Sequence, residues 1–338
     1  MGTGALLRRV RAAPVVFGSI AVVATLALTL LAAGPVYSDA VAVGALRQRL
    51  ADVPVADTAV AISARVDATE LEAFDETVTR MLDQAFGDVA RTDQHSIVSA
   101  ESFELPDQPG ERVDLARLAW IDGVRDHVDV VAGSLPGSSG AADDSDAVHV
   151  AVHADATTEL GLTVGRELTV APRSGDAEPV RIRVAAVYEV PEPTVPFWTG
   201  RERFAVPYTV TPSFRTSTLL VDEPTMTAGV SPRPNVEVVA LPRFDDVDLD
   251  DVRPLRRSLS RLEGAVETAV VRDGPASTSA LEVQTSAPGV LVDSDRALTV
   301  ARSVVFAVIV QVAVLAAFAL VLVAGIGVDA RESETNRL

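Results

Sequence analysis

Two long uncharged stretches stand near the two ends of the chain. Residues 12–38 carry no charged side chain over 27 positions, and residues 303–328 carry none over 26 positions. A helix rises about 1.5 Å per residue and the hydrocarbon core of a bilayer is about 30 Å thick, so about 20 apolar residues are enough to cross it. The pattern therefore predicts a membrane protein with two transmembrane α-helices, at residues 12–38 and 302–328.

The segment between them, residues 39–301, has the mixed periodicity of an α+β domain. Residues 39–50 are expected to continue the first span as a helix. Asp67-Ala-Thr-Glu70 is typical of a capped helix start, and Gly87 is expected to end that helix. Its apolar stripe comprises Leu71, Phe74, Val78, Met81, Leu82, Ala85 and Phe86.

Further elements follow from alternation and turn residues. A second amphipathic helix is predicted over residues 252–266, with Pro254 in its first turn. Its apolar stripe comprises Leu255, Leu259, Leu262 and Val266. One unbroken helix of about 58 Å is expected from Asp293 to Arg331. Short strands are expected at residues 59–66, 96–103, 128–131, 148–153, 168–170 and 180–190.

The Pro-rich segment 191–198 suggests a boundary between two lobes of the domain. Strands and helices that alternate with short loops on either side of it are typical of packed α+β layers. The sequence thus predicts two lobes that meet near residues 191–198.

The charges near the first stretch predict the topology. Arg8, Arg9 and Arg11 lie in residues 1–11 without acidic neighbours, and positive flanks stay in the cytoplasm. Residues 39–301 are then outside, with 23 Arg against 44 acidic residues, and the tail 329–338 returns inside. The alternative is a cleaved signal peptide over residues 1–40, but its apolar region would exceed the usual 7–15 residues.

Composition excludes several classes of function. The chain has no Cys, so disulfides, thiolate metal sites and a cysteine nucleophile are excluded. It has no Lys, so a Walker-type ATP site is excluded as well. The net charge of −18 argues against a nucleic-acid partner. No Gly-x-Ser-x-Gly or Ser-x-x-Lys motif is present, and we expect no enzyme activity.

Two clusters have the residue types of metal ligands but not the pattern. His149 and His153 alternate with valines, which indicates a strand with both rings on its wetter face. The acidic run lacks the Gly and the bidentate Glu of a calcium loop and is expected to precede a helix start. That run comprises Asp245, Asp246, Asp248, Asp250 and Asp251. The sequence predicts no metal and no cofactor.

Three segments of the chain are similar to a known family. They are Val128–Pro136, Leu160–Val170 and Arg183–Pro193 with its continuation to Trp198. In order, spacing and flanking apolar stretches they resemble the extracytoplasmic domain of FtsX-like, MacB-type ABC transporter permeases of the actinobacterial kind. The matching structural residues are Gly133, Pro136, Gly161, Gly165, Val187, Tyr188, Pro193 and Trp198. Ser134 stands where the family usually has Arg.

The last eight residues resemble the start of the family segment that couples to the ATPase. The matching positions are Arg331, Glu332, Glu334, Arg337 and Leu338. The sequence stops inside this segment, after the second span, so the family's later spans are not in it. The resemblance implies a MacB periplasmic-core-like domain and a permease subunit that works with a separate cytoplasmic ABC ATPase. It also implies a dimer of permease subunits in the bacterial plasma membrane, with the cargo unspecified.

Two other functions fit the same features. A two-span receptor or sensor would use the outer domain to bind a ligand, and a surface protein would be tethered by its carboxyl-terminal span alone. The aromatic residues Trp120, Phe197 and Trp198 are possible partner-binding groups. Aromatic residues make up only 4% of the chain, so we expect these three to anchor the core.

Overall fold

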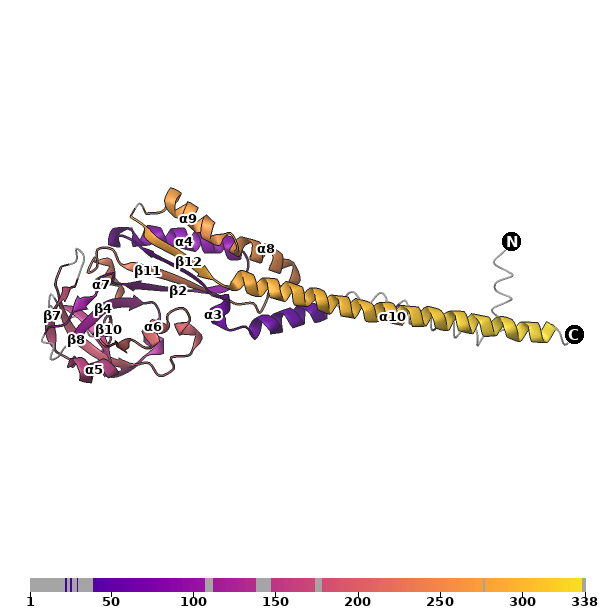
Figure 1. The fold of residues 1–338 in the computed structure, drawn as a ribbon, viewed down its shortest axis with the longest axis horizontal. Helices are drawn as coiled ribbons and strands as arrows, with labels where there is room; N and C mark the ends of the chain where they lie inside the picture. The colour runs from indigo at the N-terminus through magenta and orange to yellow at the C-terminus, as the bar shows by residue number, and fades with distance from the viewer. Residues whose placement is uncertain are drawn as a thin grey trace. The chain divides into compact units, whose positions relative to one another are not determined.

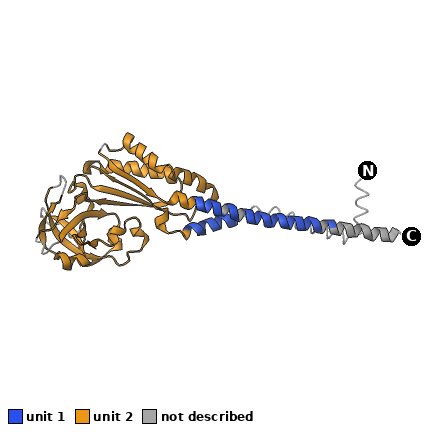
Figure 2. Ribbon diagram, in the orientation of Figure 1, with its two compact units in different colours: residues 1–50, 292–338 blue, residues 51–291 orange. Residues whose placement is uncertain are grey.

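The computed structural model describes residues 22, 25, 29, 39–106, 112–137, 147–173, 178–275 and 277–335. Its internal contacts divide the chain into two compact units (Figure 2). The smaller unit comprises residues 1–50 and 292–338, and the larger unit comprises residues 51–291.

The larger unit holds one twelve-stranded sheet and a set of short and long helices (Figure 1). Its strands are β1 (Val60–Arg65), β2 (Arg91–Val98), β3 (Phe103–Glu104), β4 (Val113–Ile121), β5 (Asp129–Gly133), β6 (Val148–His153), β7 (Glu167–Pro172), β8 (Val180–Glu189), β9 (Tyr208–Val210), β10 (Phe214–Leu220), β11 (Asn235–Pro242) and β12 (Ser279–Thr285). Its helices are α3 (Val55–Thr58), η1 (Ala68–Glu70), α4 (Leu71–Phe86), η2 (Val124–His127), α5 (Ala154–Leu160), η3 (Pro196–Trp198), α6 (Glu202–Ala205), α7 (Glu223–Thr227), α8 (Leu249–Leu259) and α9 (Leu262–Asp273). Helix α10 (Ala287–Thr335) begins in this unit and continues into the smaller one.

One half of the sheet has a split β-α-β-β-α-β arrangement. Its strand order is β12-β1-β11-β2, with β11 antiparallel to both of its neighbours. Helix α4 connects β1 to β2, and α8 with α9 connects β11 to β12. Figure 1 shows α4, α8 and α9 on one side of these strands. This is the ferredoxin-like strand order. In it β11 lies between β1 and β2, the two strands that α4 connects.

The rest of the unit, β3 to β10, is inserted between β2 and β11 in the sequence. The path β4-β3-β7-β8-β6-β10 returns on itself, because β10 also pairs in parallel with β4. β5 pairs with β8, and β9 pairs with β10. The ring of strands encloses a core that includes Tyr188, Trp198, Phe204 and Leu220.

The predicted helix after Asp67 is confirmed as α4. All seven residues of its stripe are buried, and Gly87 ends it with a φ of 57°. The start differs in detail, because the Asp67 side chain caps the turn η1 by accepting the Thr69 N–H. Glu70 accepts hydrogen bonds from Ser277 instead of completing a capping box.

The prediction of one amphipathic helix over residues 252–266 is wrong in its bounds, although the four residues of its apolar stripe are buried. It is two helices, α8 and α9, which meet at Ser260 and Arg261. A reciprocal cap between Asp248 and Asp251 starts α8 at Leu249. Pro254 therefore lies inside α8 and not in its first turn.

The strand predictions are partly confirmed. Strands at 59–66, 128–131, 148–153, 168–170 and 180–190 correspond to β1, β5, β6, β7 and β8. The strand at 96–103 is wrong: β2 begins at Arg91, and the chain turns at Ser99, whose Oγ bonds Glu101 O and Leu118 N. The pattern missed β4, β9, β10, β11 and β12.

The segment 191–198, where the sequence suggests a lobe boundary, lies inside the larger unit. The contacts separate the chain at residues 50/51 and 291/292, and the lobe boundary inside the larger unit stays a prediction. Trp198 is almost fully buried and lies in one cluster with residues of β4, β6 and β8, so it is part of the core of the larger unit.

The smaller unit is helical where it is described. Residues 39–51 form the expected helix, with Ala42, Leu46 and Leu50 buried at four-residue spacing. Helix α10 confirms the expected unbroken helix and extends it at both ends to 49 residues. Among the described residues, no helix reaches the combination of length and apolarity that crossing a bilayer takes. Most of residues 12–38 lie outside the described part, and both spans stay predictions.

Candidate functional site

The three segments that carry the family resemblance meet on strand β8. The first contains β5, which pairs with residues 186–189 of β8, and the second leads into β7, which pairs with residues 180–183. The third is β8 itself and the loop that follows it. These three segments thus form one structural element, which no single segment defines.

Two glycines of these segments are required by the backbone. Gly133 has a φ of 77°, and a Cβ there would lie 2.0 Å from the Ala185 carbonyl oxygen. Gly161 ends α5 in the left-handed region, and the Arg166 guanidinium donates to its carbonyl at 2.6 Å. Side chains are excluded at Gly133 by the close approach of β8 and strained at Gly161 by its backbone conformation.

The other family positions build the core beside β8. Tyr188 and Trp198 lie in one buried cluster, and Val187 is nearly buried. The Arg125 guanidinium donates to the Pro136 carbonyl, and the Gly165 N–H donates to the Val184 carbonyl at 2.8 Å. Burial raises the pKa of the Tyr188 hydroxyl, which has no partner among the described residues. Pro193 is exposed in the loop and does not join this group.

The aromatic residues near position 198 behave as core anchors. Trp198 is buried, and Phe197 and Trp120 are half-buried. Phe197 packs against Trp198 with ring centroids 4.7 Å apart and stacks on His127 at 3.8 Å. The expectation of core anchoring is confirmed for Trp198.

Arg201 is a buried cation that the sequence did not reveal. Its guanidinium donates to the Phe197 carbonyl at 3.0 Å and to the His95 carbonyl at 3.4 Å. Cζ lies 4.5 Å from the centroid of the Phe197 ring. Nε has no hydrogen-bond partner among the described residues. Burial lowers the pKa of Arg201 to about 10, against the opposing charge of Glu237.

An ion pair at the surface lies two residues after Arg201, in helix α6. Arg203 contacts Glu237 of β11 at 2.6 Å, and the Ser96 Oγ of β2 lies 3.5 Å from the same carboxylate. Together with Arg201, these groups link the loop after β8 to the central strands of the other half of the sheet. The arrangement holds a positive charge in place beside the Glu237 carboxylate.

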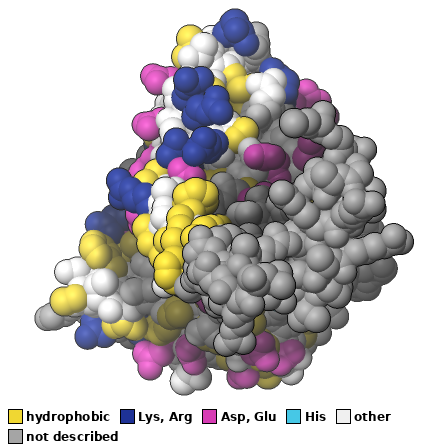
Figure 3. Space-filling view, turned by 90° about the vertical axis from the view of Figure 1, so that its right-hand side faces the viewer, with side chains coloured by type: hydrophobic (Ala, Val, Ile, Leu, Met, Phe, Trp, Pro, Cys, Tyr) yellow, Lys and Arg dark blue, Asp and Glu magenta, His cyan; other side chains and the backbone are white. Residues whose placement is uncertain are grey.

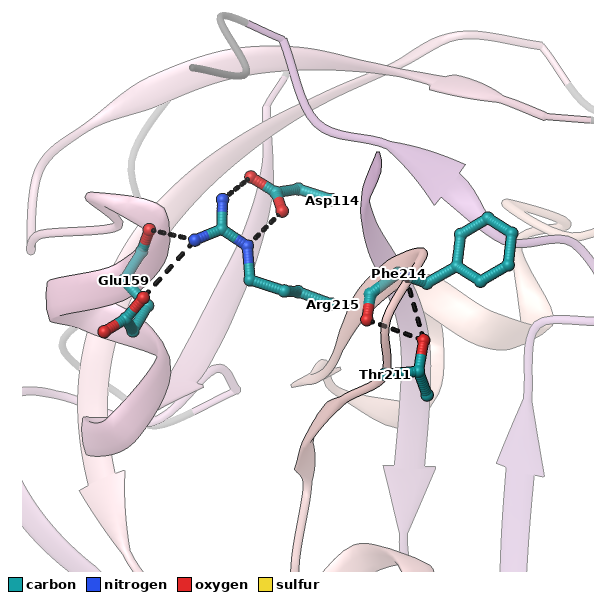
Figure 4. Close-up of polar contacts among 5 residues, drawn as sticks. All are labelled: Asp114, Glu159, Thr211, Phe214 and Arg215. Carbon is teal, nitrogen blue, oxygen red and sulfur yellow. Dashed lines mark hydrogen bonds and ion pairs between the residues drawn. The ribbon is translucent and has the colours of Figure 1, made fainter. Parts of the chain in front are cut away.

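A second ion pair, which is largely buried, joins β10 to β4 (Figure 4). The Arg215 guanidinium donates to both carboxylate oxygens of Asp114 at 2.5 Å. It also reaches the carbonyl and the carboxylate of Glu159 in α5, each at 3.3 Å. Hydrogen bonding to Asp114 raises the pKa of Arg215. The register places Arg215 directly opposite Asp114, which explains why a carboxylate interrupts the apolar pattern of β4.

The histidine and aspartate clusters have other roles. His149 and His153 lie on β6, as expected, and the Asp155 N–H donates to Nδ1 of His153 at 3.2 Å. Burial lowers the pKa of His153. The acidic run before α8 supplies its capping box, which confirms the helix-start interpretation. Within the described ranges, no group of three or more His, Asp or Glu side chains is arranged to hold a metal ion.

A pocket of about 380 Å³ lies between the end of α4 and helix α8. Residues 84–90 form one wall, and Pro254, Leu255 and Ser258 form another. Arg243 and Asp246 line it with opposite charges. This mixture selects no single class of ligand.

Helix α8 presents a basic face although the chain as a whole is acidic. Its exposed or half-buried positions include Arg253, Arg256 and Arg257, and Arg261 follows at the junction with α9. Figure 3 shows basic side chains gathered on the upper part of the molecule, which α8 and α9 occupy in Figure 1.

The predicted coupling tail is only partly described. The backbone of Arg331, Glu332 and Glu334 belongs to α10. Arg337 and Leu338 lie outside the described residues. The structure therefore brings the family positions around β8 together and leaves the tail positions without described contacts.

Comparison with known proteins assigns no family to this chain. No family model matches the chain, and no curated protein matches it. One solved structure that is similar is described as a domain of a "putative Permease protein" from Porphyromonas gingivalis. The two share 12% sequence identity, over 66% of this chain and 87% of that one, with a TM-score of 0.29. A likeness of this size carries no argument about activity.

Proposed function

We propose that this chain is the permease subunit, or part of one, of an FtsX/MacB-type ABC transporter in the bacterial plasma membrane. It would be a non-catalytic, multi-pass protein with its amino terminus in the cytoplasm. A separate cytoplasmic ATPase subunit would hydrolyse ATP, and a second permease subunit would complete the assembly. No cofactor is part of this proposal.

The observation that carries the proposal is the surface of α10. Over residues 304–321 this helix exposes nine large apolar side chains, including Phe306 and Phe318 at 67% and 63% of their surface. Monomeric soluble proteins rarely present so much contiguous apolar surface to water. Lipid tails would cover it without any polar partner, and the absence of charge over residues 303–328 fits the same environment.

The continuity of α10 supports the coupling role. At about 1.5 Å per residue, its 49 residues extend about 74 Å from the end of β12 to the predicted coupling tail. A helix without a break transmits a tilt or a shift along its axis, since its backbone hydrogen bonds resist bending. Movement of the tail by an ATPase would therefore reach the strand to which α10 is joined.

The topology has a direct test, because the chain contains no Cys. Single variants Thr3→Cys and Val271→Cys would be treated in intact cells with a membrane-impermeant maleimide. Val271 of α9 is 83% exposed and should be labelled, whereas position 3 should react only after the membrane is permeabilised. Equal labelling of both, or recovery of the chain in the alkaline wash of the membranes, rejects the membrane assignment.

The transporter assignment needs a separate test. A tagged full-length protein purified in mild detergent should retain an ATP-hydrolysing subunit. Variants Arg331→Ala and Glu332→Ala in the tail should weaken this association and leave the membrane fraction unchanged. If the protein is membrane-bound but never retains an ATPase, a receptor or a tethered surface protein becomes the better assignment.

A further inference from the structure

The β3–β10 half of the larger unit joins the ferredoxin-like half through a short strand ladder. β2 pairs with β4 at three positions, which are Ser96–Ile121, Ile97–Trp120 and Val98–Ala119. Both chain crossings between the halves lie at one end of this ladder, because β2 ends at Val98, β10 ends at Leu220, and both residues lie opposite Ala119. A short ladder with both crossings at one end has the geometry of a hinge, in which a few residues at the ends of elements absorb the movement.

The turn over residues 197–203 closes the other end of the ladder. Where β2 and β4 part, the His95 carbonyl accepts the Asp122 N–H at 3.0 Å. The same carbonyl accepts the Arg201 guanidinium at 3.4 Å, and Arg201 also donates to the Phe197 carbonyl of its own turn at 3.0 Å. Arg201 therefore ties the turn to the point where the two strands separate.

The same turn lies on the face of the sheet that points away from α4. A Cβ at Gly200 would lie 3.4 Å from the side chain of Val239 in β11. Gln94 of β2 is directly opposite Val239, and opposite residues of an antiparallel pair place their side chains on one face. The buried Gln94 side chain thus lies on the face that the turn covers, and its carbonyl oxygen has no hydrogen-bond partner among the described residues.

The buried position of Arg201 is costly in free energy. Its side chain is fully buried, it hydrogen-bonds only to uncharged carbonyls, and Nε has no partner among the described residues. Glu237 and Asp122 attract its charge only from a distance. An apolar side chain of similar volume is often at least as stable in such a place as an incompletely bonded charge. When the turn lifts off the strands, water completes the hydrogen bonds of Arg201 and Gln94, which offsets the contacts that are lost. The attached and detached states of the turn are therefore close in free energy.

We propose that Arg201 is a latch between the two halves of the larger unit. While it is attached, it fixes the angle between them, and its release lets the β3–β10 half swing about the Val98 end of the ladder. Packing alone would not require a guanidinium at this position. The inference concerns the larger unit and does not depend on the proposed membrane location or on an ATPase partner.

Distances between two spin labels test the latch. The chain has no Cys, so Val164→Cys and Val271→Cys place one label on each half, at side chains that are 44% and 83% exposed. Pulsed electron paramagnetic resonance on the full chain in detergent should give one distance with Arg201 in place. Arg201→Met, which keeps an unbranched side chain but has no donor, should add a second distance. Arg203→Met is the matched control on the same turn and should keep the single distance, because its ion pair lies at the surface.

A second label pair, Val164→Cys with Val210→Cys, lies entirely within the β3–β10 half and should give the same distance with and without Arg201→Met. An unchanged single distance between the halves in Arg201→Met, or the same second distance in Arg203→Met, would overturn the proposal.

Hydrogen exchange of the unmodified chain tests the latch without a substitution, and it decides the question where a changed internal distance shows that Arg201→Met does not fold. Release of the latch frees the Asp122 amide from the His95 carbonyl. The amides of Asp122 and of residues 197–203 should therefore exchange together, about tenfold faster than those of β11, which stay paired between β1 and β2. Exchange of these amides at the rate of β11 would mean that the latch does not open, and the proposal would fail.

Discussion

The larger unit and helix α10 place the same kinds of side chain in opposite surroundings. Phe74 of α4 is fully buried, whereas Phe306 of α10 is 67% exposed. The sequence patterns differ in the same way, since α4 has a polar face opposite its apolar stripe and residues 303–328 have none. A helix with two faces buries one of them in its own domain, but a helix that is apolar all round needs lipid or other helices. The difference supports the proposal that lipid covers the exposed apolar surface of α10.

The largest expected effect separates the two phenylalanines. Phe74→Ala removes a fully buried ring from the core and should cost about 3–5 kcal/mol in the free energy of unfolding of the larger unit. Phe306→Ala should leave that free energy unchanged, because Phe306 belongs to the smaller unit and its ring is largely exposed. Urea denaturation followed by tryptophan fluorescence measures both. Similar losses for the two variants would contradict the contrast.

A charge distinguishes water from lipid at two exposed valines. Val314→Arg on α10 should lower membrane insertion by about 2.5–3.5 kcal/mol, since an arginine in the middle of a span is costly. Val271→Arg on α9 is the matched control and should change stability by less than about 0.5 kcal/mol. These side chains are 62% and 83% exposed. The fraction of protein that resists alkaline extraction gives the answer, and a Val314→Arg variant that inserts normally would place α10 in water.

Two acids that share one arginine extend the comparison to polar groups. Asp114 is 5% exposed and Glu159 is 58% exposed, and both contact Arg215. Asp114→Ala should destabilise the larger unit by about 2 kcal/mol, because charged hydrogen bonds out of water are lost. Glu159→Ala should cost at most about 0.5 kcal/mol. Thermal unfolding of the two variants checks this, and an equal shift in Tm would mean that burial does not govern the pair.

The smallest effect concerns pH. His95 of β2 contacts Asp75 of α4 at 2.7 Å, and this hydrogen bond raises the pKa of His95 above 6.5. The pair therefore stabilises the fold fully below pH 6.5, and the gain is lost as pH rises through the higher pKa of the folded state. Asp75→Asn should remove this slope, worth about 1 kcal/mol or less, from stability measured between pH 6 and 8. Glu72→Gln on the same helix should keep the slope.

The sequence predicted elements well where one pattern was local and strong. Helix α4 follows from its seven-residue stripe and its terminal Gly87, and α10 follows from a run without helix breakers. The sequence did not predict β4, because Asp114 interrupts its apolar alternation. The carboxylate of Asp114 is neutralised by Arg215, which is 101 residues further along the chain. No local pattern contains that information.

The candidate site shows the same division. Motif similarity selected Gly133, Tyr188 and Trp198, which the fold brings together around β8. Arg201 escaped notice because Thr199-Gly-Arg-Glu202 is typical of an exposed turn. Its buried guanidinium is stabilised by hydrogen bonds to the carbonyls of His95 and Phe197, and only the folded chain brings these two groups to it.

The amino-acid sequence by itself determined the two uncharged stretches, the helices with clear stripes, and the absence of thiol and lysine chemistry. Each of these is a property of neighbouring residues or of composition. The tertiary structure alone decided that β11 inserts between β1 and β2, that β10 returns to β4, and that Arg201 is buried. Strand pairing and the burial of charge depend on contacts between distant parts of the chain, and periodicity along the chain does not encode which parts will meet.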